Sequence, residues 1–323
     1  MPPAIFKNPE HQELFDKQGF IVLDFLNPED VEFLDKTFDE MHPELPSDGG
    51  FVSGSYSQDF DYKKKASDTI RDTFMPHFER LFKDFQAIGG AFLFKMPNPN
   101  SELIAHQDWT IVDEDKYYAL NVWVPLTDIH AENGPLMVLP GSHWQKFKVL
   151  RAPTLPFFFT GNESVVKENL EPLYVKAGQT VILNQSLVHY SPPNLSDKIR
   201  KAITAGVLSK EARLRLYFND TQSDTGELEM FEQDSDFLIR FDDFFADIFQ
   251  RPKMGKSMGK VEYRVPSFTK EELSPMVRGM KRKAGFHVPE LEVVVAEEKA
   301  PEIVENPVSF FDKLKRFVGF GKN

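Results

Sequence analysis

The sequence of 323 residues contains no cysteine. This absence excludes disulfide scaffolds, cysteine-ligated zinc and iron–sulfur centres, and thiol nucleophiles, so a bound metal must be held by His, Asp or Glu. The sequence also has no apolar run approaching the roughly 20 residues that a membrane-spanning helix needs. Its first residues lack a basic segment followed by an apolar stretch, so we expect no secretory signal and predict a cytoplasmic location.

Positive charge and polar aromatic residues are also scarce. The 38 Lys and Arg residues are outnumbered by 50 Asp and Glu, and the resulting formal charge of −12 makes nucleic acid an unexpected partner. Phe is by far the commonest aromatic residue, at 31 against 8 Tyr and 3 Trp, so most aromatic surface is expected in a core. With 41% hydrophobic and 27% charged residues, the composition is that of a soluble globular protein.

The order of apolar and polar residues predicts helices on both sides of a strand-rich centre. We expect a short helix at 13–16, a strand at 19–23, a helix beginning near residue 27, a loop at 43–65 and a helix at about 67–86. Short apolar segments separated by turns follow, which is typical of an antiparallel sandwich or barrel. Expected strands lie at 91–96, 104–110, 117–126, 136–139, 173–175, 179–187 and 199–208, and a further helix at 237–249.

The C-terminal third adds three charged or amphipathic segments to a domain predicted to span residues 1–285. Residues 251–264 carry five cations and are interpreted as a solvated loop, with a dock for an anionic substrate group as the alternative. Residues 286–308 are acidic and predicted to be a linker. Residues 309–323 are predicted to form an amphipathic helix, which would pack on its own domain, bind a partner protein, or hold the chain peripherally at a membrane surface.

A histidine two residues before a carboxylate can supply two metal ligands from one strand, because residues i and i+2 of a strand point to the same face. Five of the eight histidines have an acid at this offset, so context must choose among them. His11 and His77 lie in helical stretches and His42 in a Pro-rich loop. His106 and Asp108 lie in a strand-like stretch, whereas the pair of His130 and Glu132 follows a strand end and is the weaker candidate.

His189 is the candidate for a third ligand, because the apolar alternation from residue 181 to 187 predicts that its side chain faces the barrel interior. Two His and one carboxylate on one face of an octahedron suit Fe(II). The alternative is a set of unrelated hydrogen-bonded histidines. Arg200 favours the metal site, since Ile199 and Ile203 form the apolar face of its strand and turn Arg200 inward, where a guanidinium is costly without an anion. Its fixed fork of donors matches a carboxylate.

The sequence resembles the phytanoyl-CoA dioxygenase-like family of iron(II)/2-oxoglutarate oxygenases over about two thirds of its length. The motifs that carry the resemblance, in order, are Gly19-Phe20-Ile21-Val22-Leu23, His106-Gln107-Asp108, Val122-Trp123-Val124-Pro125-Leu126, Glu132-Asn133-Gly134-Pro135-Leu136, Leu139-Pro140-Gly141-Ser142-His143, Ala177-Gly178-Gln179, His189-Tyr190-Ser191-Pro192, Asn194-Leu195-Ser196 and Arg200. The resemblance implies a mostly β fold with flanking helices around a double-stranded β-helix core of the jelly-roll or cupin-like kind.

The resemblance also implies roles for individual residues. His106, Asp108 and His189 would ligate Fe(II), and Arg200 would bind the distal carboxylate of the cosubstrate 2-oxoglutarate. Ser191 and Trp123 hold positions that line the cosubstrate pocket in this family.

The activity implied is hydroxylation of an aliphatic carbon of a small-molecule or lipid-like substrate by O2, with release of succinate and CO2. Because the acid is present at position 108, halogenation is not expected. His143 lies in a family turn signature and is expected to be structural. The alternative function is a cupin-type barrel that binds a metal or ligand without turnover, or without 2-oxoglutarate.

Overall fold

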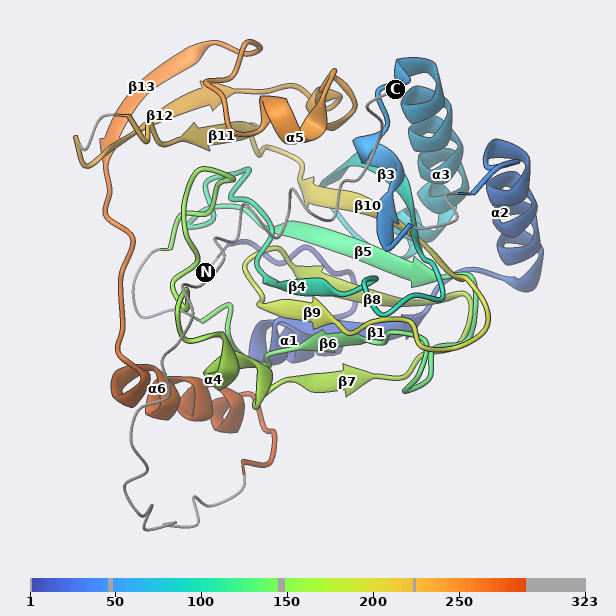
Figure 1. Cartoon of the computed structure of the whole chain (residues 1–323), viewed down its shortest axis with the longest axis horizontal. Coiled ribbons are helices and arrows are strands. Elements are labelled where there is room, and N and C mark those ends of the chain that lie inside the picture. Colours follow the sequence, from blue (N-terminus) through green and yellow to red (C-terminus); the bar gives the residue numbers. More distant parts are fainter. Residues whose placement is uncertain (1, 46–48, 145–148, 223–224, 289–323) are drawn as a thin grey trace.

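Two antiparallel sheets face each other in the computed structural model, which describes all residues except 1, 46–48, 145–148, 223–224 and 289–323 (Figure 1). The larger sheet contains β1 Phe20–Asp24, β2 Phe51–Ser53, β3 Phe85–Lys95, β5 Ala119–Pro125, β8 Gln179–Asn184 and β10 Arg200–Ser209. The smaller sheet contains β4 Leu103–His106, β6 Leu136–Val138, β7 Glu171–Leu173 and β9 His189–Ser191.

The order of the strands identifies the fold. The larger sheet runs β1-β8-β5-β10-β3-β2 and the smaller sheet runs β4-β9-β6-β7. From β3 to β10 the chain therefore crosses repeatedly between the sheets, which winds eight strands into a double-stranded β-helix. This confirms the predicted jelly-roll core with flanking helices.

Side-chain alternation along β10 separates two cores. Ile203, Ala205 and Val207 are at most 3% exposed and belong to a Phe-rich core outside the larger sheet, whereas Ala202 lies in the core between the two sheets. Because successive strand residues point to opposite faces, Arg200 and Thr204 share the inner face with Ala202, as predicted.

Three helices enclose the Phe-rich core, namely α1 Pro9–Gln18, α2 Pro28–Met41 and α3 Phe60–Leu81. The outer face of the smaller sheet is packed against α4 Glu163–Lys167 and α6 Lys270–Lys283. No helix in the described part of the chain is long and apolar enough to cross a membrane.

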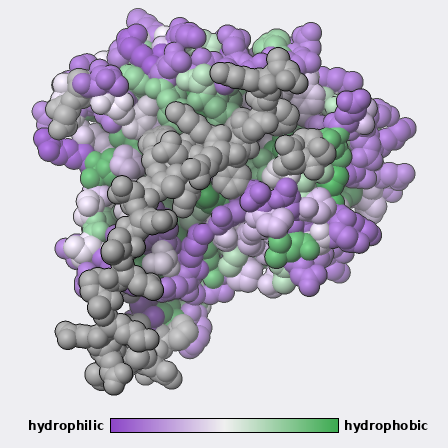
Figure 2. Space-filling model, in the orientation of Figure 1, coloured by the Kyte–Doolittle hydropathy of each residue, from purple (hydrophilic) through white to green (hydrophobic). Residues whose placement is uncertain are grey.

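One end of the barrel carries a further layer, seen at the top of Figure 1. It consists of a three-stranded sheet, β11 Arg215–Phe218, β12 Glu227–Glu232 and β13 Ser257–Glu262, and of the short helices η1 Gly54–Tyr56, η2 Phe237–Ile239 and α5 Phe244–Asp247. Figure 2 shows a largely hydrophilic surface in which hydrophobic atoms gather below this upper edge.

Several predicted boundaries were wrong. The helix expected at 67–86 begins at Phe60, because the Asp59 side chain caps it by accepting from the Tyr62 backbone N–H, and it ends at Leu81. The loop expected at 43–65 therefore contains β2, η1 and the start of α3. The helix expected at 237–249 is instead η2 and α5, separated by an irregular stretch. The strand expected at 173–175 is β7, which ends at Leu173.

The basic segment 251–264 is also not a loop throughout, because it contains the edge strand β13. Three of its five cations, Arg251, Lys253 and Lys260, are paired with acids of the same layer. Arg251 contacts Glu229 at 2.7 Å, and Lys260 contacts Glu227 at 3.0 Å. This pairing favours the structural interpretation over an anion dock.

The folded domain continues slightly past the expected boundary at residue 285. Phe286 packs its ring against Phe20, with ring centroids 6.1 Å apart, and Val288 is 7% exposed. The rest of the predicted linker and the predicted amphipathic helix at 309–323 lie outside the described residues.

Candidate metal centre

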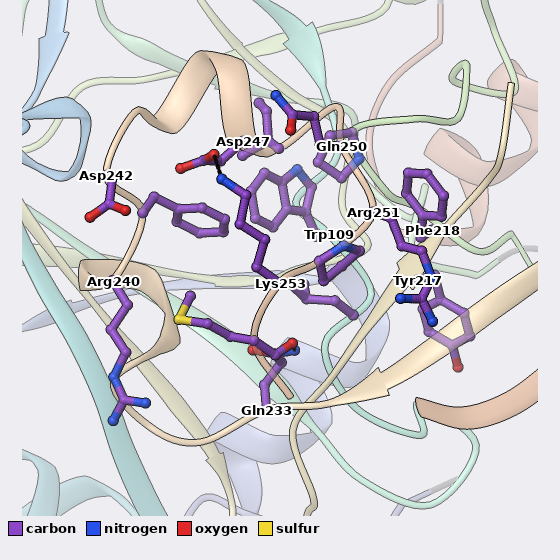
Figure 3. Close-up of a pocket in the computed structure, with 16 residues that line it drawn as sticks. Trp109, Tyr217, Phe218, Gln233, Arg240, Asp242, Asp247, Gln250, Arg251 and Lys253 are labelled. Atoms are coloured by element: carbon purple, nitrogen blue, oxygen red, sulfur yellow. Dashed lines mark hydrogen bonds and ion pairs between the residues drawn. The ribbon is translucent and has the colours of Figure 1, made fainter. Parts of the chain in front are cut away.

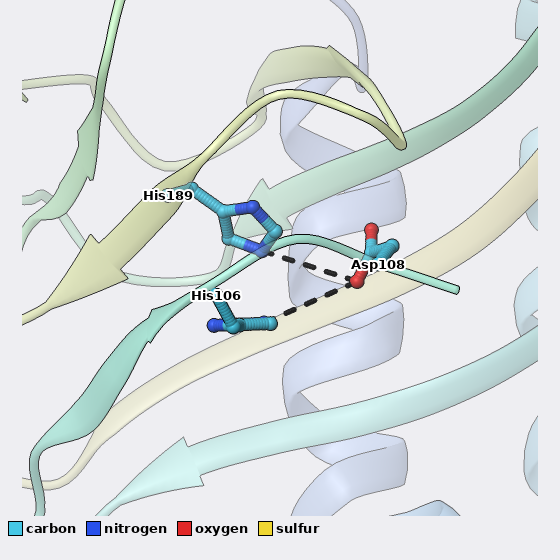
Figure 4. Close-up of side chains that lie close together, drawn as sticks. All are labelled: His106, Asp108 and His189. Carbon is cyan, nitrogen blue, oxygen red and sulfur yellow. Dashed lines mark ion pairs between the residues drawn. The ribbon is translucent and has the colours of Figure 1, made fainter. Parts of the chain in front are cut away.

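The structure brings the three predicted ligands together at one end of the smaller sheet (Figure 4). One ligand atom each from His106, Asp108 and His189 lie within 4.8 Å of one another. Each Nε2 is 4.0 Å from Asp108 Oδ1. Two metal–ligand bonds of about 2.1 Å span at most about 4.2 Å, so Asp108 Oδ1 is close enough to each Nε2 to share an ion with it.

Strand pairing and backbone hydrogen bonds orient the two imidazoles. His106 and His189 are direct partners in the β4–β9 ladder, with ring centroids 4.1 Å apart. Nδ1 of His106 lies 2.8 Å from the carbonyl oxygen of Ile104, and Nδ1 of His189 lies 3.0 Å from that of Leu187. Nδ1–H donation to these carbonyls leaves both Nε2 lone pairs directed at the centre, which is the usual arrangement of metal-binding histidines.

The path of the chain to these ligands differs from the prediction in two places. β4 ends at His106, so Asp108 reaches the centre from the segment after the strand, not from the same strand face. The strand expected at 179–187 ends at Asn184, and His189 begins a separate strand of the other sheet. A turn closed by the Leu187 N–H donating to the Asn184 carbonyl makes this change of sheet.

A relay of side chains that sequence reasoning missed holds Asp108. The Asn121 amide donates to Asp108 Oδ2 at 3.1 Å and accepts from the Thr204 hydroxyl. Nε of buried Arg151 donates to the Asp108 carbonyl at 2.8 Å, and its guanidinium also forms a bidentate pair with Glu114. These contacts constrain both ends of the ligand, its carboxylate and its backbone.

Burial sets the protonation state of His106. Burial, together with a smaller effect of the neighbouring His189, lowers the pKa of His106 to about 4, against opposing effects of Asp108 and the Ile104 carbonyl. The imidazole is therefore neutral near pH 7 and can offer its lone pair. His143 lies elsewhere, with Nε2 3.0 Å from the Asp16 carbonyl, which agrees with its expected structural role. The pair of His130 and Glu132 is exposed and is not part of the described metal cluster.

Arg200 lies beside Trp123, one of the two residues predicted to share its pocket. It is 3% exposed, and its guanidinium carbon lies 5.5 Å from the centroid of the Trp123 ring. Directly opposite it on β3 is fully buried Lys95, whose Nζ donates to the Ser191 carbonyl at 2.8 Å and to the Pro192 carbonyl at 2.5 Å. The Ser191 hydroxyl donates to a third carbonyl, that of Gly134.

The surroundings of Arg200 hold two basic side chains, Arg200 itself and Lys95, and neither forms an ion pair with an acid in the described part of the chain. Nε of Arg200 is buried without a hydrogen-bond partner in the described part of the chain. Burial lowers the pKa of Arg200 to about 9, and burial together with Arg200 lowers the pKa of Lys95 to about 5. Such a site suits an anion, because an anion would satisfy the free donor and offset the desolvated charge.

A family model described as Phytanoyl-CoA dioxygenase (PhyH) matches residues 15–202. Among curated proteins, phytanoyl-CoA dioxygenase 1 of Oryza sativa subsp. japonica is 30% identical over 132 residues, which cover 40% of this chain and 47% of that protein. Phytanoyl-CoA dioxygenase domain-containing protein 1 of Rattus norvegicus is 36% identical over 120 residues, which cover 35% of this chain and 41% of that protein. The aligned residues thus span less than half of either relative.

Solved structures with a similar fold are more distant in sequence. The carbocyclase SnoK from nogalamycin biosynthesis has a TM-score of 0.48 and 16% identity, covering 64% of this chain and 86% of SnoK. HygX from Streptomyces hygroscopicus, with nickel and 2-oxoglutarate bound, has a TM-score of 0.45 and 18% identity, and the match covers 62% of this chain and 86% of HygX. The family match extends over more than half of the chain and includes His106, Asp108, His189 and Arg200, and on that ground the chain belongs to the phytanoyl-CoA dioxygenase family.

Proposed function

We propose that this protein is an iron(II)- and 2-oxoglutarate-dependent dioxygenase that hydroxylates an aliphatic carbon of a small-molecule or lipid-like substrate. The observation that carries the proposal is the pairing of a two-histidine, one-carboxylate cluster with a buried, unpartnered Arg200. Membership of the phytanoyl-CoA dioxygenase family supports it.

The donor set fits iron. Two imidazoles and one carboxylate on one side of an ion leave other positions open, which suits non-haem Fe(II). His106 and His189 would supply their Nε2 atoms, and Asp108 would supply Oδ1. Oδ2 is already engaged by Asn121, so the relay would keep the carboxylate oriented as the ion binds.

The Arg200 pocket fits the far carboxylate of 2-oxoglutarate. Arg200 would grip it, with Trp123 beneath the guanidinium, while Lys95 keeps Ser191 and Pro192 in place at the end of β9. In this assignment the predicted Ser191 contact would use the hydroxyl oxygen or require the hydroxyl to rotate away from the Gly134 carbonyl. When bound, iron and 2-oxoglutarate supply the oxidation: one oxygen atom of O2 enters the substrate and the other enters succinate as CO2 leaves.

Anaerobic titration with Fe(II) and then 2-oxoglutarate, followed by visible absorption, tests the metal and cosubstrate assignments. We expect His106→Ala to abolish the iron-dependent absorption band of the 2-oxoglutarate complex, whereas the matched control His130→Ala retains it. Arg200→Lys should retain iron binding and raise the KM for 2-oxoglutarate about 10- to 100-fold, because lysine lacks the bidentate fork. An unchanged KM in this variant would contradict the cosubstrate assignment.

Succinate release then tests turnover and substrate class. A screen of acyl thioesters, amino acids and neutral lipids should find a compound that raises succinate release above the substrate-free rate and that gains one oxygen atom. If Fe(II) binds but 2-oxoglutarate does not, the cupin-type alternative replaces the proposal.

A further inference from the structure

A pocket of about 110 Å³ lies in the layer at the end of the barrel (Figure 3). Its link to the candidate metal centre is Trp109, which follows the candidate ligand Asp108 in the chain and lines the pocket. Much of the remaining wall is apolar, and comes from β11, α5 and the segment leading to β13. The apolar lining residues used below are Leu216, Phe241, Ile248 and Met254.

A row of three aromatic rings, Trp109, Phe244 and Tyr56, begins at the wall of this pocket. The Trp109 and Phe244 rings are stacked, with centroids 5.9 Å apart and planes at 10°. Tyr56 forms the other end of this row, and its ring centroid lies 4.8 Å from that of Phe244. Burial and, to a smaller extent, the Asp108 carboxylate raise the pKa of Tyr56 to about 12, so the Tyr56 hydroxyl lies within the electrostatic reach of that candidate ligand.

Four of the five charged side chains that line the pocket, all but Asp242, form ion pairs. Lys253 lies across the pocket in Figure 3 and contacts Asp247 at 3.3 Å. Arg251 contacts Glu229 through Nε at 2.8 Å and Nη2 at 2.7 Å. A charged ligand would have to break one of these pairs, whereas a neutral apolar group would only replace water against apolar walls.

We propose that this pocket receives a neutral, apolar end of the substrate, a single ring or a short branched alkyl group, while the carbon to be oxidised lies on the metal side of Trp109 and Phe244. The inference rests on the proposed function and names the substrate class for that site. The volume agrees with it, since an apolar cavity of about 150 Å³ in another protein binds benzene. In this arrangement the aromatic row guides the substrate and Met254 limits the depth of the pocket.

Fluorobenzene is a suitable probe, observed by fluorine NMR with the full chain. We expect saturable broadening of its signal with the wild-type protein and at least tenfold weaker binding with Met254→Trp, which fills the pocket. Met258→Trp is the matched control, because Met258 is 41% exposed on β13 and does not line the pocket. Leu216→Phe fills the pocket from another wall and is the replacement variant if Met254→Trp does not fold. Equal binding by wild-type and both filled variants would overturn the proposal.

A second measurement asks whether the pocket is close to the metal. Loading the triad with paramagnetic Mn(II) should speed relaxation of bound fluorobenzene relative to loading with diamagnetic Zn(II), and His106→Ala should remove the difference. No difference with Mn(II) bound would overturn the link between pocket and metal centre. Failure of the chain to bind Mn(II) would instead contradict the proposed function, while fluorobenzene binding to the metal-free chain would still report on the pocket.

The functional measurement uses the substrate found by the succinate screen. Met254→Trp should raise the KM for that substrate at least tenfold and leave the KM for 2-oxoglutarate within twofold of the wild-type value. Met258→Trp should change neither. An unchanged substrate KM in Met254→Trp would contradict the assignment of the pocket to the substrate.

Discussion

Arg151 is expected to contribute to both stability and metal binding, although it touches no predicted ligand side chain. Its side chain is 3% exposed and donates to the carbonyls of Asp108 and Val149 at 2.8 and 2.9 Å, besides the bidentate pair with Glu114. Arg151→Met preserves much of the volume and removes every one of these bonds. Breaking a buried pair costs about 3–5 kcal/mol. Because the Glu114 side chain is 24% exposed, we expect a loss of about 3 kcal/mol.

Urea unfolding of the metal-free chain measures this loss. The double variant with Glu114→Gln should recover about 1–2 kcal/mol, because it removes the carboxylate left without a partner. The affinity for Mn(II) should fall about tenfold in Arg151→Met, since the backbone of Asp108 loses its donor. Arg213→Met, at an exposed position, is the control and should change stability by less than about 0.5 kcal/mol. A loss below 1 kcal/mol, or unchanged Mn(II) affinity, would refute the reasoning.

Three further predictions concern other buried polar groups. Asn121→Ala should lower Mn(II) affinity about tenfold, measured by equilibrium binding, because Asp108 Oδ2 loses its donor. Burial lowers the pKa of His143 from 6.5 to about 4, so the folded state binds fewer protons than the unfolded state in this pH range. The free energy of unfolding should therefore fall by up to about 3 kcal/mol as the pH drops from 6.5 to 4. Urea unfolding of His143→Gln should show a shallower decline. The pKa of Lys95 is lowered from 10.5 to about 5. Between these two pH values the free energy of unfolding of the wild type should rise, relative to that of Lys95→Met, by up to about 1.4 kcal/mol per pH unit. Parallel stability curves for the two proteins would contradict this prediction.

The barrel could be predicted because its strands alternate clearly between apolar and polar residues. The positions at which a strand ends and the chain changes sheet could not be predicted. Val181 and Leu187 are both fully buried, so the alternation continues through a turn at which the chain changes sheet. A period of two reports which side chains are buried, not which sheet they belong to. The helix predicted from the Phe spacing at 237–249 was wrong for a related reason. Phe237 is buried in a core, whereas Phe244 stacks on Trp109, so tertiary contacts override the helical pattern.

The candidate site could be predicted where a residue's chemistry conflicts with its surroundings. Arg200 is an example, because a guanidinium on an apolar inner face requires an anion. The roles of Asn121, Arg151 and Lys95 had no such signal. Asn121 connects Thr204 to Asp108, and Arg151 and Lys95 donate to backbone carbonyls of distant segments, contacts that only the folded chain creates.

Strand β10 couples two parts of the site through its register. Arg200 at its start faces Lys95, and Thr204 four residues later engages Asn121, which in turn holds Asp108. One extra residue between positions 200 and 204 would send one of these two side chains to the helix-covered side. The bulge opposite β3 lies just beyond, between Thr204 and Gly206. Length variation along this strand is therefore best tolerated after residue 204, and a chimeric barrel should inherit residues 200–204 as one unbroken block.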